Sequence, residues 1–127
     1  MRFKQGQELV AEIENLVREN HIKAGYIITC VAGFSEVDCR MPGAKPDLQD
    51  IRTYEGDFEL VSLVGTVSIS GSHLHLSFSD KDGNVIGGHL KRGVVRMTAE
   101  IVIGVDEDKV FTRELDDETD FKELVVS

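Results

Sequence analysis

The spacing of the apolar residues restricts the fold of this sequence more than any other feature. Near the start they recur with the period of one helix face, which predicts an amphipathic helix over residues 7–20. The apolar stripe of this helix consists of Leu9, Val10, Ile13, Leu16 and Val17. Beyond it the period changes to two, which is typical of strands. One helix followed by many turn-linked strands indicates an α+β fold with a mostly antiparallel, curled sheet.

Turn residues divide the rest of the chain into expected strands. Asn20 and His21 suit a helix C-terminus, where a left-handed residue is common. Gly33 predicts a turn, residues 42–50 a loop and residues 80–84 a hairpin. The strands expected between these breaks are 26–32, 37–41, 58–69, 73–79, 85–90, 94–105 and 110–115.

Length and composition favour one globular domain over residues 1–127, since this length can bury a core without disulfide or metal support. The 41% hydrophobic content excludes a disordered or collagen-like chain. Apolar runs are only strand-sized, and the opening residues are polar, so we expect a cytoplasmic protein with no membrane partner. Cys30 and Cys39 then fit reduced core thiols.

The formal charge of −9 disfavours a module that depends on phosphate contacts with nucleic acid. Acidic residues are concentrated between positions 106 and 127, with nine acidic and three basic side chains. Lys91, Arg92 and Arg96 form the only local basic patch in the sequence.

Three of the four histidines lie in one short region. On a strand over 73–79, His73 and His75 share a face with Ser77, opposite an apolar face. A turn centred near Asp82 places residues 75 and 89 at equal distances, so His75 and His89 are expected to be cross-strand neighbours. Gly87 and Gly88 before His89 would allow close backbone approach.

Three converging imidazoles match a site for Zn²⁺, Fe²⁺ or Ni²⁺ with an open position for water or a ligand. The alternative is a solvated histidine row on an exposed strand face. His21, at the helix end, has a structural interpretation.

Other polar residues are weaker site candidates. Asp80 and Asp82 are hairpin residues first, and Glu59 and Glu100 lie among apolar strand residues, where a buried carboxylate needs a partner. The possible partners are Arg40, Arg96 and Arg113. Ser72, Ser77 and Ser79 lie near the histidines, but no nucleophile-elbow pattern surrounds them.

Several segments together resemble the PPC domain (plants and prokaryotes conserved). The most specific are Ser-His-Leu-His-Leu-Ser-Phe-Ser-Asp at 72–80 and Gly-Gly-His-Leu at 87–90. Residues 6–9, 59–63, 65–69, 82–83 and 98–103 extend the resemblance over nearly the whole chain.

The resemblance implies a compact α+β subunit that assembles as a homotrimer. It also implies that His73, His75 and His89 hold a metal ion, with Zn²⁺ expected first and Fe or Ni as alternatives. In plants the domain is fused to AT-hooks that bind AT-rich DNA. Single-domain prokaryotic versions often carry a DNA-binding label without an established activity. This sequence has no Arg-Gly-Arg-Pro hook and no basic tail, so nucleic acid is not an expected partner.

Three functional interpretations remain open. The first is a trimeric metal-binding protein that binds or transforms a small ligand at the histidine site, with the pocket expected between subunits. Whether Arg40 or Arg92 points into the site stays undecided. The second is a scaffold for protein partners. The third is a cupin-like metalloenzyme, with Asp80 near the place of the cupin acid, although the usual Pro-X-Gly before the last histidine is missing.

Overall fold

The computed structural model describes residues 1–127 and contains one helix and seven strands. In chain order these are β1 (Arg2–Lys4), α1 (Leu9–Glu19), β2 (Gly25–Arg40), β3 (Ile51–Ser68), β4 (Gly71–Ser79), β5 (Val85–Val105), β6 (Phe111–Leu115) and β7 (Lys122–Val126). The predicted α+β fold is confirmed.

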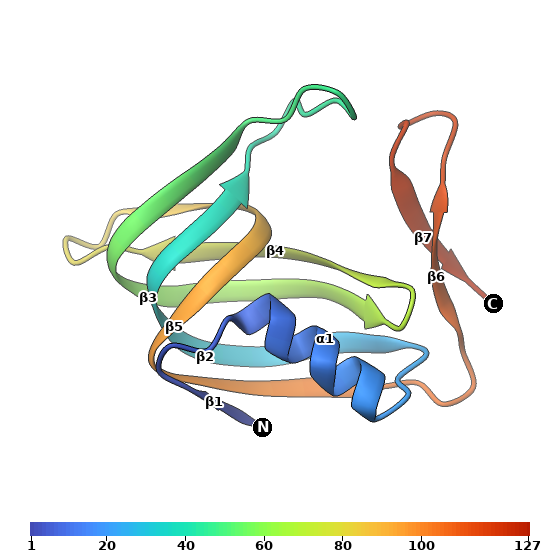
Figure 1. Ribbon diagram of the computed structural model, residues 1–127, viewed down its shortest axis with the longest axis horizontal. Coiled ribbons are helices and arrows are strands. Elements are labelled where there is room, and N and C mark those ends of the chain that lie inside the picture. Colours follow the sequence, from blue (N-terminus) through green and yellow to red (C-terminus); the bar gives the residue numbers. More distant parts are fainter.

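The main sheet curls until it closes on itself (Figure 1). Its five strands follow the order β1-β5-β2-β3-β4, and β4 also pairs with β5. Every pairing is antiparallel. The pairing that completes this closure is the hairpin formed by β4 and the first part of β5, and this hairpin carries His73, His75 and His89.

The strands are longer than predicted, and the turn expected at Gly33 is wrong. Gly33 lies inside β2 and pairs with Glu59 on one side and Arg96 on the other. A Cβ atom at this position would be 2.7 Å from the carbonyl oxygen of Arg96, so glycine serves close strand packing here. Register irregularities bend β2 without ending it. For the same reason 85–90 and 94–105 form the single strand β5.

The amphipathic helix packs one stripe into the core. Leu9, Ile13 and Val17 are buried, as the periodicity predicts, and α1 lies across the sheet with contacts to β5 and β3 (Figure 1). The helix begins two residues later than predicted, after Glu8, whose carboxylate accepts hydrogen bonds from two first-turn amides. It ends at Asn20 with His21 in the left-handed region (φ 52°), which confirms the expected C-terminus.

The core contains nineteen buried residues, with Phe34 and Phe78 among the largest side chains that are fully enclosed. Cys39 belongs to this core, while Cys30 is half-buried against it. The pKa of each thiol is raised to about 11, by burial at Cys30 and by burial together with the neighbouring Asp38 carboxylate at Cys39. Both cysteines are free, in agreement with the expected thiol state.

A separate two-stranded hairpin, β6–β7, stands beside the closed sheet (Figure 1). The sequence predicted β6 but not β7. Backbone hydrogen bonds from Phe111 to Lys23 and from Arg113 to the Ser70 hydroxyl attach β6 to the turns at one end of the sheet. No helix in the structure is long and apolar enough to cross a membrane.

Candidate metal centre

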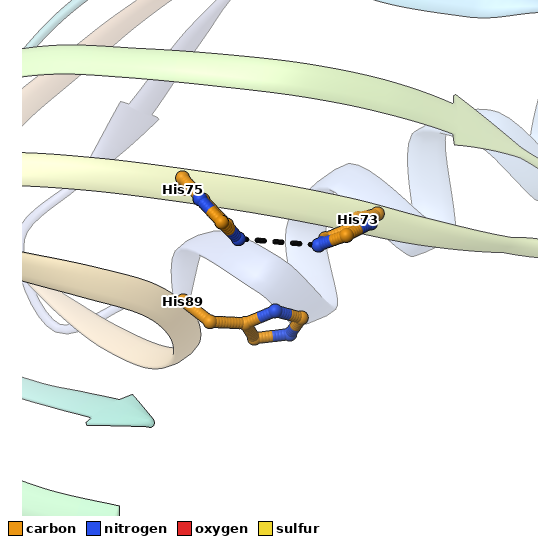
Figure 2. A group of neighbouring side chains, drawn as sticks. All are labelled: His73, His75 and His89. Atoms are coloured by element: carbon orange, nitrogen blue, oxygen red, sulfur yellow. Dashed lines mark hydrogen bonds between the residues drawn. The ribbon is translucent and has the colours of Figure 1, made fainter. Parts of the chain in front are cut away.

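Two neighbouring strands bring the three histidines together (Figure 2). His73 and His75 project from β4, and His89 projects from β5 directly opposite His75. The predicted cross-strand register is therefore confirmed. The residues that alternate with the β4 histidines, Leu74 and Leu76, are buried on the other face of β4.

The imidazole rings converge closely. Their centroids are 4.8 Å (His73–His89), 5.0 Å (His73–His75) and 5.4 Å (His75–His89) apart. The Nε2 atoms of His73 and His75 are 3.2 Å apart, as drawn in Figure 2. Each ring offers one nitrogen such that all three lie within 4.8 Å of one another.

Glycines on both flanking strands make this approach possible. A Cβ at Gly65 would be 1.9 Å from the carbonyl oxygen of His73, and one at Gly87 would be 2.2 Å from that of Leu76. At Gly88 it would meet the carbonyl oxygen of Arg40 at 2.8 Å. The expected role of Gly87 and Gly88 is confirmed, and Gly65 has the same role on β3.

The surroundings favour neutral imidazoles. Burial, followed by the positive charge of Arg40, lowers the pKa of His89 to about 3. Burial and then Arg113 also lower the pKa of His73. A histidine must be neutral to bind a metal ion, so both rings are in the ligating form at neutral pH.

Two arginines contact the rings from outside the cluster. An Nη2 atom of Arg40, at the end of β2, lies 3.3 Å from Nδ1 of His89. An Nη2 atom of Arg113, on β6, lies 3.2 Å from Nδ1 of His73. The Arg40 guanidinium also lies over the ring of Phe121, 5.1 Å from its centroid. Arg40 is therefore at the site, as one of the open alternatives had it.

The other predicted candidates lie elsewhere. Arg92 pairs with Glu36 and Arg96 with Asp57, so neither points to the histidines. Glu59 and Glu100 are exposed, not buried carboxylates that need a partner.

The polar residues of the β4–β5 hairpin have local roles. Asp80 accepts hydrogen bonds from Asp82 and Asn84 within the turn, so it is not a fourth ligand of the cupin type. Ser77 shares a hydrogen bond with the Ser62 hydroxyl across the strands, and the side-chain hydrogen bonds of the three histidines involve only arginines and each other.

The histidines face cavities of moderate size. One of about 390 Å³ is lined by His73, His89 and residues of the β6–β7 hairpin, among them Lys122 and Glu123. A larger cavity of about 680 Å³ lies between the end of α1 and β5 and contains none of the three histidines. We place the candidate site at the smaller cavity because converging polar groups, and not volume, distinguish a functional site.

The β6–β7 hairpin contributes residues to the site that the sequence did not predict. Phe121, Lys122 and Glu123 were assigned only to an acidic segment, yet they form one wall of the histidine cavity. The turn-forming residues 116–120 between two β-prone runs were the available signal, since such a cluster predicts a hairpin. The sequence indicates Arg113 only as a possible partner for a carboxylate, and not as a neighbour of His73.

The donor set fits a divalent transition metal. Two nitrogens bound to one tetrahedral zinc ion at about 2.0–2.1 Å lie roughly 3.3 Å apart. The Nε2 atoms of His73 and His75 are already 3.2 Å apart. Three imidazoles and no carboxylate form a set that suits Zn, Fe or Ni better than Mg or Ca.

The fold and the site together define a class: small α+β proteins with a curled antiparallel sheet and three converging histidines on adjacent strands. The chain belongs to the Plants and Prokaryotes Conserved (PCC) domain family, which matches residues 1–106. This confirms the PPC resemblance. The β6–β7 hairpin lies outside the matched residues.

Known proteins similar to this chain include two bifunctional GlmU proteins from Synechococcus strains, 32% and 31% identical over 125 residues. The chain spans only 19% and 20% of their lengths.

Three solved structures share the fold. A hypothetical protein from Salmonella cholerae-suis is 34% identical, with a TM-score of 0.93 over 100% of this chain and 90% of that one. A protein from Ralstonia eutropha, named as a candidate DNA-binding protein, is 23% identical, with a TM-score of 0.88 over 100% of this chain and 90% of that one. A metal-containing protein from Archaeoglobus fulgidus has a TM-score of 0.80, with 23% identity and 98% and 90% coverage.

Proposed function

We propose that this protein binds one divalent metal ion per subunit through His73, His75 and His89, with zinc as the first candidate and iron or nickel as alternatives. The observation that carries this proposal is the convergence of three nitrogens within 4.8 Å from two paired strands. The lowered pKa values of His73 and His89 support it, because both rings are neutral. A bound divalent ion would act as a Lewis acid toward a carbonyl or phosphoryl oxygen of a small ligand.

We further propose that the active form is a homotrimer with the metal site near a subunit interface. Exposed apolar side chains on the adjacent strands β5, β2 and β3 support self-association, since such patches usually mark interaction surfaces. They are Ile28, Val31, Val61, Val64 and Val102. Val64 is the cross-strand partner of His75, so this apolar face adjoins the histidines. A ligand bound there would contact more than one subunit.

The decisive experiment is elemental mass spectrometry on tag-free protein purified without added metal. The expected result is about one ion per subunit in the parent, with loss of the ion in His73→Ala, His75→Ala and His89→Ala. His21→Ala is the matched control, because this histidine lies at the end of α1 and should leave metal content unchanged. Retention of the ion in the three site variants contradicts the proposal.

Light scattering of the same samples with and without a chelator separates the alternatives. A trimer that contains no metal, even after incubation with Zn²⁺, would favour the scaffold interpretation.

Binding to an AT-rich duplex that weakens with salt would favour a DNA-associated role. The net charge of −9 and the pairing of Arg92 and Arg96 with carboxylates argue against that role.

A further inference from the structure

The two arginines beside the histidines have no anionic partner in this chain. Neither Arg40 nor Arg113 has a carboxylate oxygen within 4.0 Å, whereas Arg52, Arg92 and Arg96 each form an ion pair. Arg2 and Arg18 also lack an ion pair, but both are exposed. The chain contains 23 acidic residues, so carboxylates are not scarce. Two half-buried guanidiniums whose contacts include only rings and a carbonyl are therefore open to an external anion.

The cavity between these arginines is basic, in contrast to the rest of the protein. Its wall carries Arg40, Lys91, Arg113 and Lys122 against a single acidic side chain, Glu123. The whole chain has a net charge of −9. A concave positive site on an acidic surface concentrates small anions and repels larger polyanions. Its volume of about 390 Å³ is in the range of small-molecule sites.

The hydrogen bonds of the arginines and metal binding exclude each other. A neutral imidazole has one N–H and one lone pair, and a guanidinium can only donate. His73 and His89 therefore use their Nδ1 lone pairs to accept from Arg113 and Arg40.

Ligation removes this acceptor whichever nitrogen binds the metal. Ligation through Nδ1 uses the same lone pair, and ligation through Nε2 moves the ring proton to Nδ1. Metal loading thus releases both guanidiniums next to a divalent cation.

We propose that the released Arg40 and Arg113 form an oxyanion site for a small carboxylate or phosphate ligand of the metal-loaded protein. This inference rests on the metal site proposed above and names the class of its ligand. A guanidinium fork matches a carboxylate or phosphate through two parallel hydrogen bonds. The Arg40 guanidinium packs over the face of the Phe121 ring, and the Arg113 guanidinium donates to the carbonyl of Lys122. Both guanidiniums therefore remain at the cavity wall.

Arginines that bind an anion beside the metal couple anion binding to metal binding, which purely structural arginines would not do. Without an anion, two positive charges beside the site oppose binding of a cation. With an anion this opposition is neutralised, so anion and metal each raise the affinity for the other by the same factor. Removal of one arginine should therefore strengthen metal binding in anion-free buffer and abolish the response to anions.

The experiment measures zinc affinity by competition with a chromophoric chelator, alone and with inorganic phosphate or succinate as the probe. We expect either probe to raise the zinc affinity of the parent by about tenfold. Arg40→Gln and Arg113→Gln should bind zinc several-fold more tightly than the parent without a probe and should not respond to one. Arg18→Gln, an exposed arginine on α1 with the same charge change, should behave as the parent.

The outcomes separate the anion site from the metal site. A response to phosphate alone or to succinate alone assigns the ligand class. No response in the parent, or the same response in the site variants, overturns the proposal. If the parent takes up none of zinc, iron and nickel, the proposed function fails. Calorimetry of both probes with metal-free protein then tests whether the anion site exists without a metal ion. Binding that Arg40→Gln abolishes would retain the anion site but overturn its dependence on metal.

Discussion

At the scale of single residues, the site depends on a glycine as much as on histidines. Gly65 has a φ of +143°, which side-chain-bearing residues rarely adopt. It pairs with Leu74 and lies against the backbone of His73, where a Cβ would be 1.9 Å from the carbonyl oxygen. No small movement relieves such an overlap, so this residue determines how closely β3 approaches the histidine strand.

Gly65→Ala is expected to lower the free energy of unfolding by about 3 kcal/mol or more, through backbone strain and a steric clash. Gly43→Ala is the matched control, because Gly43 also has a positive φ (+83°) but nothing within 4 Å of the added atom. It should cost only about 1–2 kcal/mol. Urea unfolding of both variants measures the difference, and equal losses would contradict the role given to Gly65.

At the scale of elements, α1 is anchored to the sheet by the residue that precedes it, Glu8. Glu8 precedes the helix and accepts from the amides of Val10 (3.1 Å) and Ala11 (2.7 Å). The same carboxylate accepts from the amide of Gly93 on β5 at 2.8 Å. One side chain thus satisfies helix-end donors and a strand amide, which couples the placement of the helix to that of β5.

Glu8→Ala should therefore destabilise the protein by about 2 kcal/mol, more than loss of a helix cap alone, because the Gly93 amide also loses its partner. Glu14→Ala, on the exposed face of the same helix, should change stability by less than about 0.5 kcal/mol. Thermal unfolding followed by circular dichroism tests both. A cost at Glu8 no larger than that at Glu14 would show that the capping contacts contribute little.

At the scale of the whole molecule, the closed sheet buries its apolar residues on one side and leaves others exposed on the opposite side. Val31 is 60% exposed and Val64 is 58% exposed, on the neighbouring strands β2 and β3. The helix covers the inner face only. A second copy of the chain is the occupant that we propose for this outer face.

Val31→Asp is expected to shift the proposed trimer to monomers, because it places an unpaired carboxylate in a desolvated interface. Leu48→Asp, at a position 72% exposed in the 42–50 loop, should leave the assembly intact. Sedimentation velocity gives the mass of each species. An unchanged mass for Val31→Asp, with a folded spectrum, would place any interface elsewhere.

The parts of the site that could be predicted from sequence are local in the chain. The alternation over 73–79 and the turn near Asp82 correctly predict that His75 and His89 are cross-strand neighbours. The prediction succeeds because a hairpin fixes its own register through its turn. The Gly33 turn is wrong because a glycine inside a strand and a glycine in a turn look alike without the partner strands.

By itself, the sequence determined the helical stripe, the α+β class and the three-histidine cluster, since each depends on a short-range period or a single turn. Only the tertiary structure decided which charges surround the cluster. Arg40 is 49 residues from His89, and Arg113 is 40 residues from His73. Their positions follow from the closure of the sheet and the docking of the β6–β7 hairpin. Long-range pairings of this kind depend on the packing of the whole chain and leave no local pattern.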